Sequence, residues 1–391
     1  MNGEAQAIEF RGRGVSASTS PRIREVSVRD FRSYVRAGLT LGDGLTVISG
    51  PNGAGKTNLL EAVYFGCTGR SCLASNEREV VRFGASSARV VVRVEADDGA
   101  HQLAVGFAPG EPKRLLVDDA PVDTMLDSGM RPLLTVFLPD RLDLVKGPPA
   151  VRRSHLDQLV AALWPARVQT RRAYAQTLAQ RNALIARIRS YGGSRGDLAA
   201  WDLQLARHGI ALMADRRSAV DAVSELVVEL ADELGVGAPT AIAYRPRSRA
   251  ESAQELADEL AAKTESDLER GFTGHGPHRD ELSLLRDGRE LRSYGSQGQQ
   301  RLALLALLLA ERDAIGRLRG SLPVMLLDDV MSELDHDRRL SLSTRLRRGA
   351  GQAIVTSAEL SQVPGADSPE VEAVTVSPGG GLGSALQREA R

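Results

Sequence analysis

Eight consecutive residues match the pattern of a phosphate-binding loop, G-x-x-x-x-G-K-[ST], at every fixed position. In order they are Gly50, Pro51, Asn52, Gly53, Ala54, Gly55, Lys56 and Thr57. Such a loop turns backbone N–H groups toward phosphate oxygens, while Lys56 reaches the β- and γ-phosphates and the Thr57 hydroxyl ligates Mg²⁺. The pattern predicts a site for a nucleoside triphosphate with Mg²⁺, and an inert glycine-rich turn is the alternative.

Two adjacent aspartates supply the acidic groups that hydrolysis at such a loop needs. Asp328 and Asp329 follow the apolar run 324–327, which predicts a buried strand. We expect Asp328 to hold Mg²⁺ through water, as a metal residue together with Thr57, and Asp329 to polarise the attacking water. Asp329 and Lys56 are therefore the expected catalytic residues. Two aspartates after a strand could instead only cap the next turn, but the loop favours the catalytic interpretation.

A third segment, 295–301, opens a strongly apolar helix. Ser296 is a good N-cap residue, and the free N–H groups at a helix start favour an anion. The alternative is a capped core helix without a ligand, since the run 302–310 has the composition of core. This segment lies about 30 residues before Asp328, an order that resembles a known ATPase architecture, and the resemblance favours a nucleotide-binding role.

Hydrophobic periodicity predicts the elements that must position these groups. Strands are expected at 23–28, 39–41, 45–48, 88–95, 102–107, 114–117, 282–285, 324–327 and, as the final strand, 353–356. Helices are expected at 56–65 and 297–312. More than 100 residues from Val151 onward have a helical pattern. Breaks at Pro165, at 192–196 and at 235–239 argue against one long coiled coil.

These elements predict an α/β fold with a discontinuous domain. Residues 21–150 and 271–385 form that domain, which includes an antiparallel side sheet, and residues 151–270 form a mainly helical insertion. Residues 1–20 are polar and aperiodic, so we expect a disordered tail.

Charge is balanced overall but not along the chain. Lys+Arg and Asp+Glu number 50 each, yet 151–220 hold 12 arginines against 4 aspartates, and 221–270 hold an acidic excess. The basic stretch is suited to the sugar–phosphate backbone of DNA, which positions a protein without reading sequence. The candidate DNA contacts are Arg171, Arg172, Arg187 and Arg189. The alternative is a solvated helix face.

Composition also excludes some classes of protein. The longest apolar run, 302–310, is too short to cross a bilayer, and the first residues lack the apolar core of a secretory signal, so we expect no membrane contact and a cytoplasmic protein. Cys67 and Cys72 cannot form a disulfide framework and are expected to be reduced packing residues.

The order of the three motifs resembles that of the ABC-type P-loop ATPases and their SMC-like chromosomal relatives. Within that group the sequence is similar to the RecF family of bacterial recombinational repair proteins, over about 22–385. The similarity rests further on the stretches 28–34 (VRDFRSY), 69–71 (GRS), 139–140 (PD), 144–147 (LVKG), 152–157 (RRSHLD), 275–278 (HGPH) and 328–335 (DDVMSELD).

The resemblance implies an ABC-type head in which ATP is sandwiched between the two protomers of an ATP-dependent homodimer. Lys56 and Thr57 then act on ATP of their own protomer. Ser296, Gly298 and Gln299 contact the γ-phosphate from the partner, and Asp335 lies at the dimer interface. Residues 356–358 lack the switch histidine of transporters, which implies slow hydrolysis, and Asp140 stands where transporters carry glutamine.

The function implied is that of an ATP-dependent DNA-binding protein in recombinational repair, the SOS response and the processing of replication gaps. ATP binding would drive dimerisation on DNA at single-strand/double-strand junctions and help RecR- and RecO-type mediators load RecA. Weak, DNA-stimulated ATP hydrolysis would release the protein, and the helical insertion would be a lever or a DNA-contacting domain.

Two other functions are weighed against this one. The ATPase subunit of an ABC transporter would have a shorter stretch between loop and signature, a glutamine loop and a switch histidine, and this chain differs in all three. An SMC-like structural ATPase needs hundreds of residues of heptads, which the glycine and proline breaks exclude.

Two details qualify the resemblance. Cys72-Leu73 stands where relatives carry an aromatic and a basic residue, so a nucleotide or DNA contact made there does not transfer. His275, His278 and Asp280 could hold a metal, but the intervening Gly276-Pro277 favours a structural turn near the nucleotide.

Overall fold

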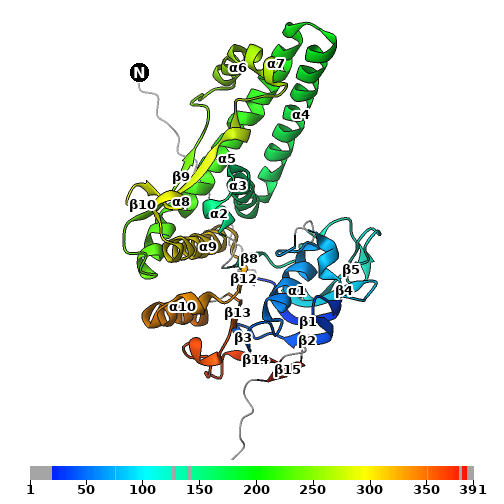
Figure 1. Ribbon diagram of the computed structural model, residues 1–391, viewed down its shortest axis with the longest axis vertical. Helices are drawn as coiled ribbons and strands as arrows, with labels where there is room; N and C mark the ends of the chain where they lie inside the picture. The colour runs from blue at the N-terminus through cyan, green and yellow to red at the C-terminus, as the bar shows by residue number, and fades with distance from the viewer. Residues whose placement is uncertain are drawn as a thin grey trace, which may run out of the picture.

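The computed structural model describes residues 20–74, 76–125, 129–138, 142–349, 351–377 and 381–384. Figure 1 shows a head, in which two sheets and α1 lie below and to the right, and an elongated helical part that rises from it. Of the expected tail, residues 1–19 lie outside the described residues, as does Asp140. No helix in the described ranges is both long enough and apolar enough to cross a membrane.

The central sheet of the head carries the strands that precede the predicted motifs. Its order is β15-β14-β3-β13-β12-β8, and its strands pair in parallel except for β15. The bounds are β3 Leu45–Ser49, β8 Leu134–Phe137, β12 Val324–Leu327, β13 Ala353–Ser357, β14 Glu372–Ser377 and β15 Gly381–Ser384.

Strict alternation along β12 divides the core between the two faces of this sheet. Met325 and Leu327 pack on one face, with α9 (Gln297–Arg319) and α10 (His336–Arg348). Val324 and Leu326 pack on the other face, with α1 (Lys56–Thr68). A strand with both faces buried becomes a continuous apolar run, which is why its sequence shows no polar alternation.

A second, antiparallel sheet covers the far side of α1. Its order is β2-β1-β4-β5-β6-β7. The bounds are β1 Arg22–Phe31, β2 Tyr34–Thr40, β4 Ala88–Ala96, β5 Gly99–Phe107, β6 Arg114–Val117 and β7 Ala120–Pro121, and the 3₁₀ turn η1 spans Glu77–Val80. The inner face of this sheet shares its core with α1, and the outer face carries charged side chains. The predicted side sheet is confirmed.

The helical part is built on one long helix, α5 (Leu198–Glu233). One end of α5 packs in the head core with α3 (Pro149–Leu163) and α9, and the other end packs with α4 (Val168–Tyr191) and α6 (Ala253–Ala262). The short helices are α2 Asp143–Lys146, α7 Thr264–Arg270 and α8 Leu291–Tyr294, and the 3₁₀ turns are η3 Pro165–Arg167, η4 Arg195–Asp197, η5 Pro277–Arg279, η6 Val330–Glu333 and η7 Leu360–Gln362.

The expected breaks lie where these helices end. Helix α3 ends before Pro165, and α4 ends at Gly192, whose φ of 79° is left-handed. Gly235, with φ of 66°, follows α5. An α-helical chain that folds back at each break makes a compact bundle rather than a coiled coil, as predicted.

Three expectations need correction. β9 (Thr240–Arg245) lies in the stretch expected to be helical and pairs with β10 (Glu281–Arg286), which also pairs with β11 (Arg289–Glu290). The strand at 353–357 is not the final one, because β14 and β15 follow it. The helix expected at 297–312 continues to Arg319 and ends at Gly320, which has φ of 68°.

Candidate functional site

The glycine-rich loop lies between β3, at the centre of the sheet, and the first turn of α1. Gly50 and Gly55 have φ of 152° and 107°, in the range that favours glycine. A Cβ on Gly50 would lie 2.3 Å from the carbonyl oxygen of Val376, and one on Gly55 would lie 2.7 Å from the hydroxyl of Tyr34. Both glycines are therefore required by the packing of this loop.

Lys56 lies under the loop rather than in solvent. Only 7% of the residue is exposed, and its Nζ donates to the carbonyl oxygens of Gly50 (2.7 Å) and Pro51 (3.1 Å). Burial lowers the pKa of the ammonium, and the carboxylates of Asp329 and Asp328 oppose that shift. A phosphate group at the loop would supply the negative charge that this ammonium lacks.

Asp328 joins the loop to the ends of β12 and β13. Its carboxylate accepts hydrogen bonds from the hydroxyls of Thr57 (2.9 Å) and Thr356 (2.6 Å). Burial raises the pKa of this carboxyl, and the two threonine hydroxyls lower it in part. The structure thus brings together the two residues expected at the metal, and their hard oxygen donors are of the kind Mg²⁺ prefers.

Asp329 adopts a left-handed backbone conformation, with φ of 43°. Its N–H donates to Thr356 Oγ1 (2.9 Å), and its Oδ2 accepts from the hydroxyl of Ser332 (2.9 Å). Its other oxygen, Oδ1, is buried and has no hydrogen-bond partner among the described residues. A water molecule admitted beside this oxygen would meet an unused hydrogen-bond acceptor.

Tyr34 supports the loop from the antiparallel sheet. Its hydroxyl donates to the carbonyl oxygen of Gly55 (3.1 Å), and burial raises its pKa to about 12. The stretch 28–34 contributes a second support, since Arg32 pairs with the fully buried Glu61 of α1 through two hydrogen bonds of 2.6 and 2.8 Å. This part of the resemblance motif therefore positions the loop and α1.

Tyr34→Phe is expected to lower the free energy of unfolding by about 1 kcal/mol, because the ring still fills its place while one hydrogen bond is lost. Urea unfolding followed by circular dichroism measures the change. Tyr294→Phe is the control, because Tyr294 is exposed and its substitution should leave stability unchanged. Equal stability of the two variants would mean that the Tyr34 hydroxyl does not stabilise the loop.

The signature residues lie at the N-terminus of α9, across the central sheet from α1 (Figure 1). Ser296 and Gln299 form a capping box, in which Ser296 Oγ accepts from the Gln299 N–H (3.3 Å) and Gln299 Oε1 accepts from the Ser296 N–H (2.9 Å). Ser296 and Gly298 are exposed. No hydrogen bond within the described ranges joins these residues to the glycine-rich loop of the same chain.

The four candidate DNA arginines lie on α4. All four are exposed, and Arg172 and Arg187 lie opposite the buried face of the helix, whereas Arg171 pairs with Asp157 (3.1 Å). Arg181, from the same basic stretch, is fully buried and pairs with Asp202 (2.6 Å) and Asp267 (2.7 Å). Part of the basic stretch is therefore an internal ion-pair network, which the sequence could not show.

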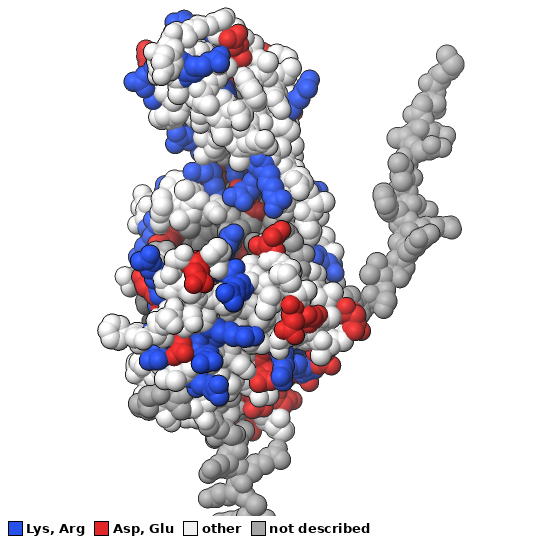
Figure 2. Space-filling model, turned by 90° about the vertical axis from the view of Figure 1, so that its right-hand side faces the viewer, with Lys and Arg blue, Asp and Glu red and all other residues white. Residues whose placement is uncertain are grey.

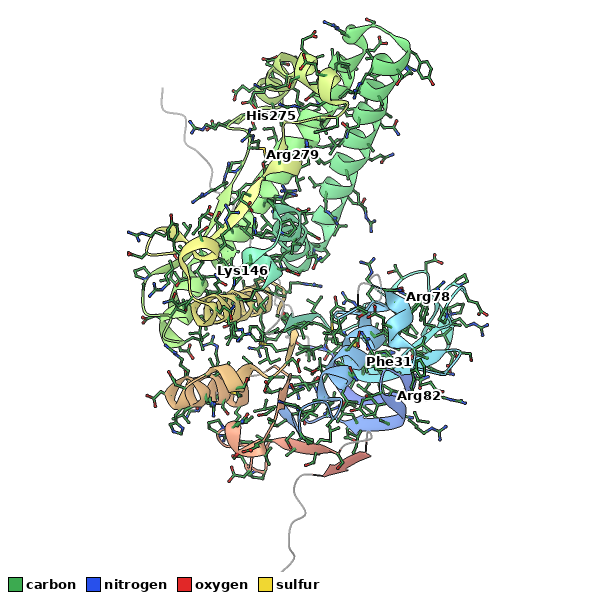
Figure 3. The ribbon with its side chains drawn as sticks, viewed as in Figure 1. Phe31, Arg78, Arg82, Lys146, His275 and Arg279 are labelled. Atoms are coloured by element: carbon green, nitrogen blue, oxygen red, sulfur yellow. The ribbon has the colours of Figure 1, made fainter. Side chains whose placement is uncertain are left out.

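The turn that contains His275 and His278 belongs to the helical part. Figure 3 labels His275 there, away from Phe31 and the head. His275 pairs with Glu259 (2.6 Å), and His278 contacts the Tyr174 hydroxyl (2.8 Å) and the Thr273 carbonyl oxygen (2.9 Å). Burial lowers the pKa of His278 to about 4.

This placement corrects the expectation of a turn near the nucleotide of the same chain. Within the described ranges, no group of three or more His, Cys, Asp or Glu side chains is arranged to hold a metal ion. Neither Cys67 nor Cys72 takes part in a disulfide bond within the described ranges.

Sequence reasoning missed Tyr34, Thr356 and Ser332. Thr356 bonds to both aspartates, and Ser332 bonds to Asp329. Thr356 ends the strand expected at 353–356, and where strands are parallel their carboxyl ends meet at one edge of the sheet. That rule could have identified Thr356, whereas the contact of Tyr34 depends on how the two sheets pack and leaves no local signal.

The chain is similar in sequence to proteins of known family. A family model of an AAA domain matches residues 25–108. The DNA replication and repair protein RecF of Anaeromyxobacter sp. (strain Fw109-5) is 38% identical over 372 residues, which cover 91% of this chain and 99% of that protein. RecF of Streptomyces avermitilis is 35% identical and covers 88% of this chain and 95% of its own length.

Solved structures agree. The structure of the recombination mediator protein RecF-ATP in the RecFOR pathway has a TM-score of 0.81 at 26% identity and covers 95% of this chain and 99% of its own. An Smc head domain from Pyrococcus furiosus, with a TM-score of 0.58 at 17% identity over 93% of this chain and 96% of its own, shares the fold alone. The chain has an α/β head of the ABC and SMC type, and it is 38% identical to a RecF protein over 99% of that protein's length. The chain therefore belongs to the RecF family of DNA replication and repair proteins.

Proposed function

We propose that this chain is an ATP-controlled DNA-binding switch of recombinational repair and of replication-gap processing. The observation that carries the proposal is the cluster at the edge of the central sheet, where Lys56, Thr57, Asp328 and Asp329 meet beneath the glycine-rich loop. Lys56 and the loop N–H groups would bind the β- and γ-phosphates. Thr57 and Asp328 would hold Mg²⁺, which supplies positive charge at the phosphates.

Asp329 is the residue proposed to act on water. Its unpaired Oδ1 is available to take a proton, and Ser332 holds the other oxygen in place. Thr356 stands near this site where transporters carry a histidine, and its hydroxyl is already engaged by Asp328. A site without that histidine is suited to slow hydrolysis, so we propose a weak ATPase that DNA stimulates.

The exposed signature supports the proposed homodimer. Ser296, Gly298 and Gln299 lie on the opposite side of the sheet from the loop that they are expected to complete. Within the described ranges, one chain does not bring them into hydrogen-bonding contact with its own loop. A second copy facing the first can do so, and we therefore propose that ATP binding closes a dimer with Asp335 at its interface.

DNA is the proposed partner of the closed dimer. Two solved relatives are a recombination mediator protein of the RecFOR pathway. On that basis we propose action in the cytoplasm at single-strand/double-strand junctions, with RecR- and RecO-type mediators that load RecA. We further propose that residues 21–150 and 271–385 form the head and that 151–270 form a lever that reaches DNA. Figure 2 shows Lys and Arg around the narrowing between the two parts.

Ser296→Arg tests the composite site. The variant should still bind ATP through its own loop, whereas its bulk and charge should block dimer closure, so ATP hydrolysis should fall at least about tenfold. Sedimentation with and without ATP measures dimerisation. Ser296→Ala is the control for dimerisation, because it removes the hydroxyl and the helix cap, worth about 1 kcal/mol, without the bulk and charge that should block closure.

Mixing experiments sharpen this test. A Ser296→Arg protein mixed with a Lys56→Ala protein should form heterodimers with one intact composite site, so the mixture should hydrolyse ATP faster than either variant alone. If mixing gives no increase in ATP hydrolysis, or if the Ser296→Arg protein dimerises normally, the signature acts only as a helix cap. The switch mechanism would then fall.

The α4 arginines provide an independent test of the lever. Arg172→Glu combined with Arg187→Glu should weaken binding similarly for all DNA sequences and flatten the salt dependence of the binding constant, because both side chains are exposed and would neutralise phosphates. Arg249→Glu, on an exposed loop of the same part, is the control. Full binding with an unchanged salt slope would make α4 a solvated face.

A further inference from the structure

Four arginines form one row across the outer face of the antiparallel sheet. Arg36 on β2 pairs in register with Arg29 on β1, and Arg29 pairs in register with Arg89 on β4. Gly106 on β5 lies opposite Arg89 on one side and opposite Arg114 of β6 on the other. Residues in register on neighbouring strands point to the same face, so the four side chains share one surface.

This row faces solvent. All four arginines are exposed, and the neighbouring residues Val28, Val90 and Val105 point inward and are buried. Within the described ranges Arg36, Arg89 and Arg114 make no ion pair, and the closest carboxylate to Arg29 is that of Asp30, at 3.8 Å. Of the other acids at this end of the sheet, Glu77 pairs with Lys113, Glu79 lies 3.7 Å from Arg32, and Glu111 and Asp123 are exposed.

Like charges directly opposite each other on neighbouring strands destabilise a sheet. The other end of the same face avoids this cost, because Arg93 pairs with Glu25 (2.9 Å), Arg24 pairs with Glu95, and Arg22 pairs with Asp43 (3.2 Å). The row is thus the place on this sheet where arginines lie opposite one another, and Asp30 is the one carboxylate in the described ranges that pairs with any of them. An anionic partner would supply counter-charges.

An exposed aromatic ring lies beside the row. Arg82 bonds to Asp30, the neighbour of Arg29, through both its side chain (2.8 Å) and its N–H, which donates to the Asp30 carbonyl oxygen (2.8 Å). Figure 3 labels Arg82 at the right-hand edge of the head. The next residue, Phe83, is 98% exposed. A phenyl ring so fully in water is free to stack on another flat group.

We propose that the arginine row and Phe83 form a nucleic-acid surface, in which the row binds the sugar–phosphate backbone and Phe83 stacks on a base left unpaired where duplex DNA meets single strand. This inference rests on the proposed DNA-binding function and places a contact on the head, apart from α4. It also gives the protein a physical means to distinguish a junction from plain duplex.

The chemistry of the surface favours nucleic acid over an acidic peptide. Strands are about 4.8 Å apart, so the row extends over roughly 19 Å in a line, which suits a continuous polyanion. Guanidinium groups bind phosphate oxygens through two parallel hydrogen bonds. Stacking on an aromatic side chain is a general way to hold an unpaired base, whereas an acidic peptide has no corresponding group.

The test compares two double variants that remove the same charge from the same two strands. Arg29→Gln with Arg89→Gln alters the row, and Arg22→Gln with Arg93→Gln alters the other end of the sheet. Full-length proteins are titrated, with ATP and Mg²⁺, against a blunt duplex and against the same duplex carrying a single-stranded tail. The row variant should bind both DNAs at least about tenfold more weakly, with a salt slope reduced by roughly 2, and the control should bind like wild type.

A thermal unfolding scan separates this effect from misfolding. The row variant should unfold at the same or a higher temperature than wild type, because it relieves repulsion between neighbouring guanidinium groups. Its ATP hydrolysis without DNA should be unchanged. Phe83→Ala should weaken binding to the tailed duplex about fivefold or more while leaving blunt-duplex binding intact, and Phe83→Trp should restore the preference.

The outcomes distinguish this inference from the function on which it rests. Failure of the wild-type protein to bind either DNA overturns the proposed function. Normal DNA binding by the row variant overturns this inference alone, and loss of binding to an acidic partner protein in the same variant would assign the row to that partner. Equal losses of DNA affinity in both double variants would mean that the row contributes only as general surface charge.

Discussion

A Lys56→Ala protein is expected to hydrolyse ATP about 10²- to 10³-fold more slowly than wild type and to bind ATP weakly, because one preorganised donor to the phosphates is lost. In the folded chain this ammonium donates to Gly50 and Pro51 and is almost fully buried. Burial lowers the pKa of Lys56, because the charged ammonium loses contact with water. Phosphate oxygens would offset this loss of solvation.

The fold should survive this substitution, since the apolar core lies on the two faces of the sheet and Ala54 is the loop residue that it contains. Equilibrium ATP binding, steady-state hydrolysis and circular dichroism measure the three properties. Lys263→Ala is the matched control, because Lys263 is an exposed lysine at the end of α6 and its loss removes the same charge. Wild-type hydrolysis by the Lys56→Ala protein would refute the assignment of the loop.

Asp329→Asn should separate ATP binding from hydrolysis. We expect ATP to bind normally and hydrolysis to fall by about 10²-fold or more, because the amide has the shape of the carboxylate but cannot take a proton. Asparagine also tolerates the left-handed φ of 43° at this position, so the turn should keep its conformation. The closed dimer should therefore accumulate with ATP.

Single-turnover hydrolysis and sedimentation with ATP measure the two halves of this prediction. Asp337→Asn is the control, since Asp337 is exposed in the first turn of α10 and undergoes the same chemical change. Normal hydrolysis by the Asp329→Asn protein would mean that another group activates water. Loss of ATP binding would instead mean that Asp329 helps to hold the nucleotide.

The strands that carry the motifs could be predicted because each is buried on both faces. The run that ends at Leu327 has no polar residue and is followed at once by Asp328, so its type and its role are visible together. β9 is different. Its sequence Thr-Ala-Ile-Ala-Tyr-Arg is short and mixed, and it becomes a strand because Glu281–Arg286 offers an edge that lies 36 residues or more along the chain.

The residues of the candidate site also fall into two groups, those that the sequence alone identifies and those that it does not. Residues within one motif, such as Lys56 and Thr57, could be identified from their spacing alone. Arg181 could not be distinguished from the exposed arginines of α4, because the carboxylates that neutralise it come from α5 and α7. Tyr34 was likewise hidden, since its hydroxyl reaches Gly55 only when the antiparallel sheet packs over α1.

The neighbours of β3 have a consequence for how the chain is made. β3 is complete by Ser49, yet it is hydrogen-bonded on one side to β13 and on the other to β14, which follow about 300 residues later. At roughly 5 to 20 residues per second, a ribosome needs about 15 to 60 s to supply them. Until then β3, which precedes the nucleotide loop, has two unpaired edges. The apolar faces of α3 and α5 also stay uncovered until α9 is made. The nascent chain should therefore depend on chaperones through most of its synthesis, and it should gain affinity for nucleotide only near the end.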